Sequence, residues 1–406
     1  MSKSENIKSF NENPFPKDWE TDLLDNLTKR GSGHTPDKEF DEYYNGGIKW
    51  ISLADSYRLD KGLIYETEIE ISELGIKKSS AVLHPAGTVL MSRDAGVGKS
   101  AVMGTDMAVS QHFIVWRCKE NILDNWFLYY WLQFKKEYFE RQAVGSTIKT
   151  IGLPLFKKLK ITHPEYSEQK AIAHILGVMD TAINQNNQLI TQKELRKKWL
   201  MQNLLTEKKR LKGFSGEWKE YKLAYFIEDY YEKPKEGNNY EVLTSAKTGL
   251  MKQTDYYGDN RITNREDADY NVIPPNYLTY RSRSDDGLFT FNKNTLGITG
   301  LISGYYPVFT IKNGDLDFIL MYCNYYRQQL TKYSIGTSQL VLSMNALKTA
   351  NFNFPEINEQ TAIAQLLQTA DKEIQLLKTK TEKLRLQKKG MMQVLLTGKK
   401  RLKINN

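Results

Sequence analysis

The sequence predicts an α+β protein with an internal repeat, in which two variable α/β domains are separated by two long helices that pair as an antiparallel coiled coil. Two observations predict this architecture. A segment of 49 residues that begins at Pro164 occurs again from Pro355, with 23 identical positions. In both copies the apolar residues recur at spacings of four and three, which is the pattern of a coiled coil.

The repeat divides the chain into four parts. PEYSEQKAIA opens the first copy, PEINEQTAIA opens the second, and both copies end in KKRLK. A weaker likeness between FPKDW, which begins at Phe15, and FSGEW, which begins at Phe214, marks the start of each unit. The predicted parts are a first variable domain at 1–164, a conserved central helix at 165–212, a second variable domain at 213–355 and a conserved C-terminal helix at 356–406.

The two conserved helices are expected to start after Pro164 and Pro355, with Ser167 and Asn358 as candidate caps for the free N–H groups. Each copy carries a heptad seam of about 33 residues, and one helix alone cannot bury such a seam. We therefore expect the two copies to pair with each other.

The seam residues are the candidates for helix pairing and for docking a partner. They are Ile172, Leu176, Met179, Ile183 and Asn186 in the first copy, and Ile363, Leu367, Ile374, Leu377 and Thr381 in the second. A register centred on the helices would place Asn186 opposite Thr381 as one buried polar layer, a device that fixes register at a cost in stability.

Both variable segments have the texture of short strands and tight turns. β-branched and aromatic runs, as at 271–292, are broken by Gly, Pro and Asp. A helix is expected over 125–142, where the apolar spacing approaches the helical period. Each variable domain is therefore predicted to mix strands with short helices.

Composition excludes several classes of protein. The chain has 406 residues, 57 Lys and Arg against 48 Asp and Glu, and a net charge of +9. No run of about 18 apolar residues and no apolar leader occurs, so neither a membrane segment nor a signal peptide is predicted and a cytoplasmic location is expected. Two cysteines cannot form a disulfide framework. Much of the basic charge falls in 193–212, with eight basic and two acidic residues, and in 378–403, with ten and one.

No active site is predicted. The histidines lack metal-ligand spacing. AGVGKS, which starts at Ala95, resembles a phosphate loop, but Arg93 stands where that loop needs its first glycine. The prediction is a chain without catalytic residues, metal ligands or a cofactor of its own.

Two turn regions carry side chains suited to reading DNA, because Arg and Gln can bond base edges while Ser, Lys and backbone N–H groups hold phosphates. The candidates are Ser92, Arg93, Lys99, Gln111 and His112 in the first domain, and Arg281, Ser282, Arg283, Tyr305 and Tyr306 in the second. The alternative is a solvated turn with charge pairs such as Arg283 with Asp285.

The chain resembles the specificity subunit of type I restriction-modification systems. The resemblance is carried by FPKDWE, by GSTIKTIGLPLFKKLKI followed by HPEYSEQKAIAHIL, by FPEINEQTAIAQLL, and by the repeated LLT and KKRLK ends. It implies two target recognition domains, each reading one half of a bipartite site in double-stranded DNA. It also implies that the subunit is not catalytic.

The partners are likewise implied by the resemblance. Two methyltransferase subunits would dock on the helices and methylate adenine with S-adenosylmethionine, and two motor-nuclease subunits would use ATP and Mg²⁺ to translocate and cleave DNA. No membrane partner is expected. Two alternatives stay open, namely a stand-alone DNA-binding regulator that dimerises through its coiled coil and a protein-binding scaffold that does not bind nucleic acid.

Overall fold

The structure is a computed structural model that describes residues 15–235, 237, 239–258 and 270–402. The polar stretch 1–13 and Lys403 lie outside the described residues. The first was used to predict that no signal peptide is present, and the second was counted in the basic charge of 378–403. The chain divides into two compact units, each with one variable domain and one stretch of both long helices. The first unit is Met1–Asn187 with Thr379–Asn406, and the second is Gln188–Lys378.

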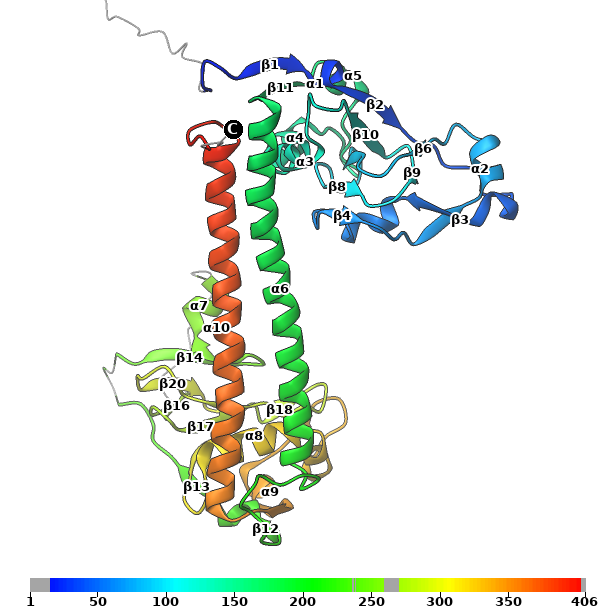
Figure 1. The fold of residues 1–406 in the computed structure, drawn as a ribbon. Helices are drawn as coiled ribbons and strands as arrows, with labels where there is room; N and C mark the ends of the chain where they lie inside the picture. Colours follow the sequence, from blue (N-terminus) through cyan, green and yellow to red (C-terminus); the bar gives the residue numbers. More distant parts are fainter. Residues whose placement is uncertain (1–14, 236, 238, 259–269, 403–406) are drawn as a thin grey trace, which may run out of the picture. The chain divides into compact units, whose positions relative to one another are not determined.

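The first variable domain alternates short strands with short helices (Figure 1). In chain order its elements are β1 (Glu20–Leu23), α1 (Leu24–Leu27), β2 (Thr28–Ser32), β3 (Tyr44–Ile51), β4 (Leu63–Ile64), β5 (Ile69–Ile71), α2 (Glu73–Lys77), β6 (Leu83–His84), β7 (Val89–Ser92), β8 (Ser100–Met103), β9 (Met107–Val109), β10 (Phe113–Cys118), α3 (Asn125–Phe134), α4 (Lys136–Gln142), α5 (Leu153–Lys157) and β11 (Lys160–His163).

Three sheets form this domain. A five-stranded sheet has the order β2-β10-β7-β8-β4, a four-stranded sheet has the order β5-β3-β9-β6, and β1 pairs with β11 as a separate ribbon. Every residue of β7 and β8 is buried, which explains why VLMS and SAVM lack the alternation of a half-exposed strand. The ribbon joins the first strand of the domain to the last.

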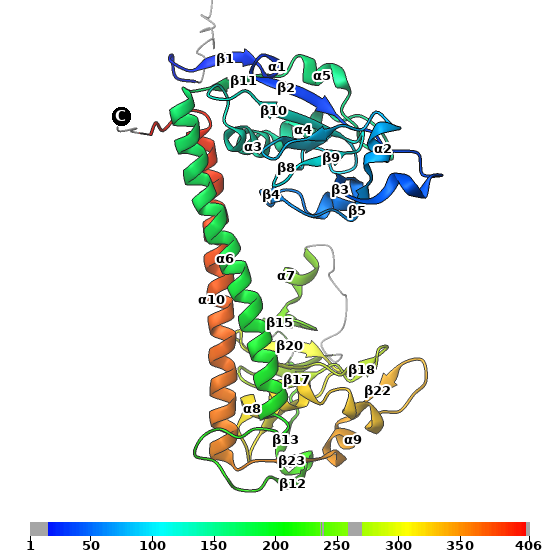
Figure 2. The same ribbon diagram turned by 45° about the vertical axis from the view of Figure 1, so that its right-hand side comes forward.

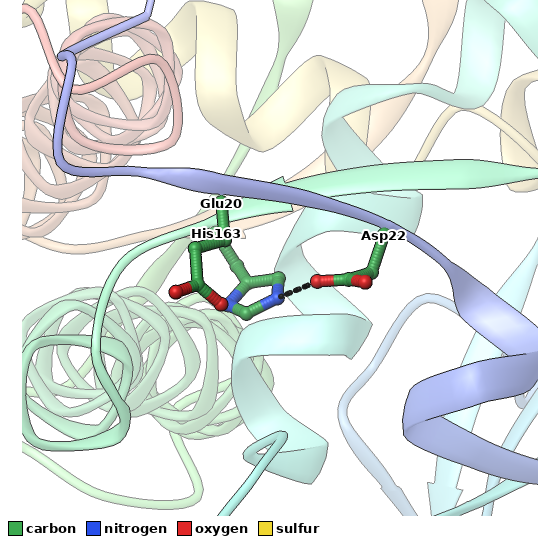
Figure 3. A group of neighbouring side chains, drawn as sticks. All are labelled: Glu20, Asp22 and His163. Carbon is green, nitrogen blue, oxygen red and sulfur yellow. Dashed lines mark ion pairs between the residues drawn. The ribbon is translucent and has the colours of Figure 1, made fainter.

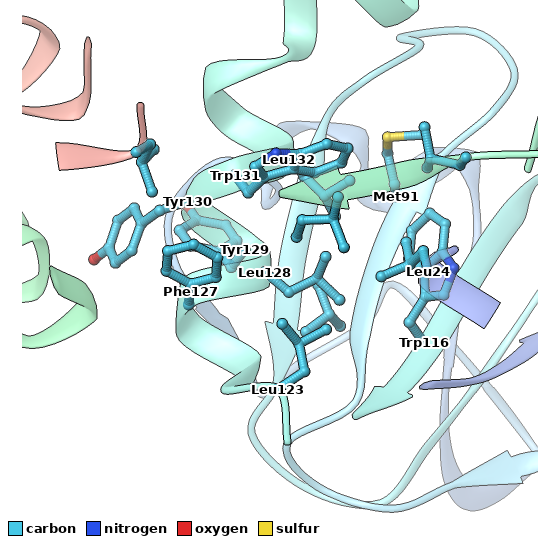
Figure 4. Packing of buried hydrophobic residues seen from close by; sticks show 14 of the residues in the cluster. Leu24, Met91, Trp116, Leu123, Phe127, Leu128, Tyr129, Tyr130, Trp131 and Leu132 are labelled. Carbon is cyan, nitrogen blue, oxygen red and sulfur yellow. The ribbon is translucent and has the colours of Figure 1, made fainter. Parts of the chain in front are cut away.

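The helix expected over 125–142 is two helices, because the chain leaves helical geometry at Lys135 between α3 and α4. Figure 4 shows side chains of α3 packed toward Met91 of β7 and Trp116 of β10. Burying one large apolar side chain contributes about 1.5–3 kcal/mol, so α3 is a principal contributor to the core of this domain.

The second variable domain is built in the same way. Its elements are β12 (Lys219–Lys222), β13 (Ile227–Tyr230), β14 (Glu241–Ala246), β15 (Gly249–Lys252), α7 (Gln253–Tyr257), β16 (Tyr270–Ile273), β17 (Leu278–Tyr280), β18 (Arg283–Ser284), β19 (Phe291–Lys293), β20 (Gly300–Ser303), β21 (Val308–Ile311), α8 (Leu316–Tyr325), β22 (Leu340–Val341), α9 (Met344–Thr349) and β23 (Asn351–Phe354). Its sheets have the orders β13-β21-β17-β19 and β15-β14-β20-β16, and the pairs β12-β23 and β18-β22 stand apart.

The repeat forms two helices of 39 residues each, α6 (Tyr166–Leu204) and α10 (Ile357–Leu395). Both start one residue before the predicted caps, so Ser167 and Asn358 lie inside the first turn and the cap prediction was wrong. In the first unit Asp180 of α6 pairs with Lys388 of α10 at 2.5 Å. The helices therefore run antiparallel there, side by side in both views (Figures 1 and 2).

The second unit contains the same contact with the two copies exchanged. Lys197 of α6 pairs with Asp371 of α10 at 2.5 Å. In the repeat, Asp371 corresponds to Asp180 and Lys197 to Lys388. Each unit thus contains the same helix contact with the copies exchanged, which confirms the predicted antiparallel pairing of the two helices.

The heptad seam is also confirmed. The predicted seam residues are buried or half-buried, with Thr381 at 2% exposed, whereas most other positions of both helices are exposed. Asn186 donates its amide to Ala182 O at 3.0 Å. The pairing of Asn186 with Thr381 stays a prediction.

Both helices complete the core of each domain. The first core includes Ile172 and Leu176 from the start of α6, and Leu395 from the end of α10. The second core includes the equivalent residues Ile363, Leu367 and Leu204. Each domain thus rests on the beginning of one copy and the end of the other.

Candidate nucleic-acid interface

The turn between β7 and β8 holds most of the first-domain candidates together. Asp94 Oδ2 lies 2.7 Å from His112 Nδ1, and Arg93 Nε lies 3.7 Å from Asp94 Oδ1. Gly96 and Gly98 have φ of 116° and 83°, which only glycine adopts without strain, so the turn needs both. The sequence prediction did not include Asp94, which orients the two basic side chains.

Several of these candidates are occupied by contacts within the domain. Ser92 is 1% exposed and donates its hydroxyl to Asp94 O. Lys99 donates to the backbone and side chain of Ser56 at 3.1 and 3.0 Å. Gln111 is exposed, and its Oε1 accepts a hydrogen bond from Thr35 at 2.6 Å. Ser92 and Lys99 therefore shape the turn, while Gln111 is exposed and Arg93 and His112 are half-buried.

Four of the five second-domain candidates, Arg281, Arg283, Tyr305 and Tyr306, line one cleft of about 330 Å³. Arg281 and Arg283 are exposed at its wall, and the Arg283 guanidinium lies 4.1 Å from the centre of the Tyr305 ring. Tyr306 also lines the cleft. A cationic, aromatic and polar lining of this kind suits contacts with the base edges and phosphates of a nucleic acid.

Hydrogen bonds and an ion pair fix the loop that carries these arginines. Ser282 is buried and donates its hydroxyl to Tyr305 O at 2.6 Å. Asp286 accepts hydrogen bonds from Ser284 and Leu288 N, and it pairs with Lys247, whose hydrogen bond is the main cause that lowers the pKa of that carboxyl. Asp285 accepts from Gln339 at 3.0 Å. The predicted alternative pair of Arg283 with Asp285 is thus replaced by Arg283 on Tyr305 and Asp285 on Gln339.

A hairpin loop lies beside the candidate turn in each domain. In the first domain Val144 pairs with Thr150, and Thr150 also bridges to Asp94. In the second domain Ile335 pairs with Val341, which in turn pairs with Arg283. These loops contain GST and GTS, both exposed. The two triplets resemble each other in the sequence. This likeness could have indicated the surface of the two hairpin loops, which the predicted site residues do not include.

Comparison with known proteins assigns the family. The family model for the type I restriction modification DNA specificity domain matches the chain twice, at residues 16–195 and 217–386. The chain belongs to the type I restriction-modification specificity subunits. The two matches each span one variable domain and most of the helix that follows, so the repeat found in the sequence is a repeat of this family domain.

Relatives and solved structures agree with this assignment. The MjaVIII specificity subunit of Methanocaldococcus jannaschii is 24% identical over 99% of this chain and 97% of its own. The MjaIX specificity subunit from the same organism is 28% identical over 46% of this chain and 45% of its own. The crystal structure of the S subunit from M. genitalium has a TM-score of 0.59 at 14% identity and covers 98% of this chain and 99% of that chain. The HsdS subunit from Thermoanaerobacter tengcongensis has a TM-score of 0.50 at 16% identity and covers 95% and 98%.

A glutamine at the same position of both repeat copies, Gln169 and Gln360, helps to position each recognition domain of the specificity subunit. Asp124 caps α3 by accepting from Phe127 N, and its own N–H donates to Gln169 of α6 at 2.9 Å. In the second domain Asp315 caps α8 and donates in the same way to Gln360 of α10 at 3.0 Å. Both glutamines are buried. Apart from the weak likeness of FPKDW and FSGEW, the sequence revealed the repeat only from Pro164, and the structure extends it into the recognition domains.

The seam candidates serve helix pairing and the domain cores. Ile172, Leu176, Ile363 and Leu367 are each 1% exposed or less. Such burial leaves little surface at these four positions for a partner. Among the described residues no helix is long and apolar enough to cross a membrane.

Proposed function

We propose that this chain is the non-catalytic subunit that gives a type I restriction-modification complex its DNA specificity. Each recognition domain would read one half of a bipartite, asymmetric site, and the paired helices would set the separation of the half-sites. One observation carries the proposal, namely that two different domains are mounted on two copies of one helix through the same contacts.

The division of labour follows from the chemistry of adenine methylation. The target adenine must leave the base stack before it can be methylated, which requires an enzyme beside the reader. S-adenosylmethionine would be bound by two methyltransferase subunits, and ATP and Mg²⁺ by two motor-nuclease subunits. A location with the DNA in the cytoplasm accords with these partners.

Two equivalent exposed leucines are the candidates for partner docking. Leu195 of α6 is 62% exposed and Leu386 of α10 is 69% exposed, and they occupy the same position of the repeat. Leu386 has charged neighbours on α10, whereas Leu195 has the exposed side chain of Trp199 one helical turn further along α6, so each is an apolar contact on a largely polar helix. Two equivalent contacts suit two copies of one methyltransferase subunit.

The ion pairs at the basic helix ends indicate that tight DNA binding depends on partner subunits. Lysines of the basic helix ends are engaged in ion pairs, as in Lys193 with Glu373 and Lys378 with Glu194. We therefore expect this chain alone to bind DNA weakly, with affinity and site preference rising when the methyltransferase is added. A stand-alone regulator would instead bind a defined site tightly by itself.

Methylome sequencing tests the proposal. Cells that carry the gene and its methyltransferase should methylate adenine in a bipartite motif that disappears when this gene is deleted. Replacing Phe15–His163 with the matching segment of another family member should change one half of that motif only. A change in both halves, or no motif that depends on the gene, would overturn the proposal.

A further inference from the structure

The ribbon of β1 and β11 gathers three metal-binding side chains on one face. Glu20 is directly opposite His163 in the antiparallel register, and Asp22 lies two residues further along β1, on the same face. One ligand atom from each side chain lies within 4.8 Å of the other two. Figure 3 shows the imidazole of His163 directed toward Asp22, with Glu20 beside it.

The contacts of Nδ1 assign the tautomer of a neutral His163 imidazole. Its Nδ1 lies 3.0 Å from Pro164 O, which can only accept a hydrogen bond. Gln169 Nε2 lies 3.4 Å from the same nitrogen but makes shorter bonds, to Pro164 O at 2.9 Å and Ile122 O at 3.0 Å. An amide has two N–H donors, so Gln169 has none to spare for the ring. Nδ1 therefore carries the proton and donates to Pro164 O.

That assignment leaves the Nε2 lone pair facing the carboxylate of Asp22. His163 is 6% exposed, and its Nε2 is buried without a hydrogen-bond partner. The nearest charged atom is Asp22 Oδ2 at 3.5 Å, too far for a hydrogen bond of ordinary length. A positive charge between this lone pair and the carboxylates removes their repulsion, and either a proton on Nε2 or a bound metal ion supplies it.

We propose that Glu20, Asp22 and His163 bind a divalent transition-metal ion, for which Zn²⁺ is the probe. One imidazole and two carboxylates match the donor set of zinc, and the Nδ1–H bond to Pro164 O is the outer contact that metal-bound histidines usually make. Zinc–ligand distances of about 2.0–2.2 Å require the ligand atoms to close by about 1 Å. Glu20 is exposed and the Asp22 side chain is 36% exposed, so both can rotate to do so.

The second recognition domain supplies an internal comparison. Its equivalent ribbon pairs β12 with β23, where Lys219 is opposite Phe354 and Tyr221 takes the place of Asp22. None of these three is a carboxylate or an imidazole. The cluster is therefore not required by the shared scaffold, and the bound ion would clamp the first strand of the first domain to the last, directly before α6.

Zinc titration of the full untagged chain by calorimetry tests the site. We expect one ion to bind per chain with a Kd in the micromolar range. At saturating zinc, the unfolding midpoint of the first unit should rise by about 2–8 °C. Asp22→Asn, at a half-buried position, and Glu20→Gln, at an exposed one, should each weaken binding by about tenfold or more. His163→Phe, which copies Phe354, should abolish it, and Mg²⁺ should not compete because imidazole is a poor ligand for it.

His174→Gln is the matched control, because His174 is an exposed histidine of the same unit. It should leave zinc affinity unchanged. Co²⁺ in place of Zn²⁺ should give visible absorption that His163→Phe removes. The proposal is overturned if no saturable binding occurs, or if binding persists unchanged in Asp22→Asn and His163→Phe. Asp22→Asn keeps the test decisive even if His163→Phe does not fold.

Discussion

Arg401 donates hydrogen bonds to both carboxylate oxygens of Glu168, with Nε at 2.8 Å from Oε1 and Nη2 at 2.7 Å from Oε2. The pair recurs between Arg210 and Glu359, which are the same residues of the repeat with the copies exchanged. Glu168 and Glu359 are 4% and 1% exposed. In both pairs the carboxylate is the main cause that raises the pKa of the guanidinium. The basic run KKRLK therefore contains one arginine per copy that fastens the end of one helix to the start of the other.

Arg210→Ala should destabilise the second unit by about 3–5 kcal/mol, because it leaves the charge of Glu359 buried without a partner. Adding Glu359→Gln should recover part of the loss by removing that charge. Arg385→Ala is the control, since Arg385 pairs with Glu382 on the surface and should change stability by less than about 1 kcal/mol. Denaturant unfolding followed separately in each unit measures these effects. Equal losses for Arg210→Ala and Arg385→Ala would contradict the argument.

Gln360→Ala should loosen the second recognition domain from its helix. The amide side chain accepts from Asp315 N and donates to Pro355 O, and each buried group left unpaired costs about 1–3 kcal/mol. Hydrogen exchange at the start of α8 should accelerate. Gln365→Ala, at an exposed position of the same helix, should leave exchange at α8 unchanged. Unchanged exchange in Gln360→Ala would show that the contact does not hold the domain.

Arg283→Ala should weaken or relax recognition of one half-site while leaving the other half unchanged. Its guanidinium lies on Tyr305 at the cleft wall, and the loss of one bidentate base contact costs about 1–3 kcal/mol. Lys332→Ala removes a cation of the same domain that lies over Tyr333 and does not line the cleft. Methylation of half-site variants by the complete complex gives the readout. Equal effects of the two substitutions on the motif would argue against the cleft as the reading surface.

Leu195→Asp together with Leu386→Asp should abolish assembly with the methyltransferase and leave the fold intact. Both side chains are exposed, so the substitutions remove no core contact. Co-purification measures assembly, and the unfolding midpoint reports the fold. Gln192→Asp with Lys383→Asp is the matched control, one helical turn away on the same helices. Retained assembly in the leucine variant would exclude these positions as the docking contact.

The two cysteines should report unfolding of their own domains. Burial raises the pKa of both thiols to about 12, from an ordinary value of 9.0. The stabilising preference for the neutral thiol is present in full below about pH 9 and is lost as the pH rises toward 12. At pH 8, alkylation of Cys323, which is 5% exposed, should require unfolding and follow denaturant concentration. Rapid alkylation without denaturant would contradict this burial.

The repeat, the helix seam and the strand-rich domains could be predicted from sequence because each depends on periodic or local patterns. Asp94, Gln169 and Asp124 could not be assigned roles, since their partners come from elements distant in the chain. The same limit applies to the face shared by Glu20 and His163, which only strand pairing brings together. Ser92 and Lys99 have side chains suited to phosphate contacts, but their burial or engagement within the turn depends on tertiary packing that residue type does not encode.

The division of the chain into units also has a consequence for synthesis. The second unit is one continuous stretch, so all of its contacts can form while the end of the chain is still on the ribosome. The first unit needs Leu395 for its core and Arg401 for Glu168, and both residues are translated after the whole second unit. The domain made first is therefore finished second, and a truncated chain should expose an incomplete first core to the cell's proteases.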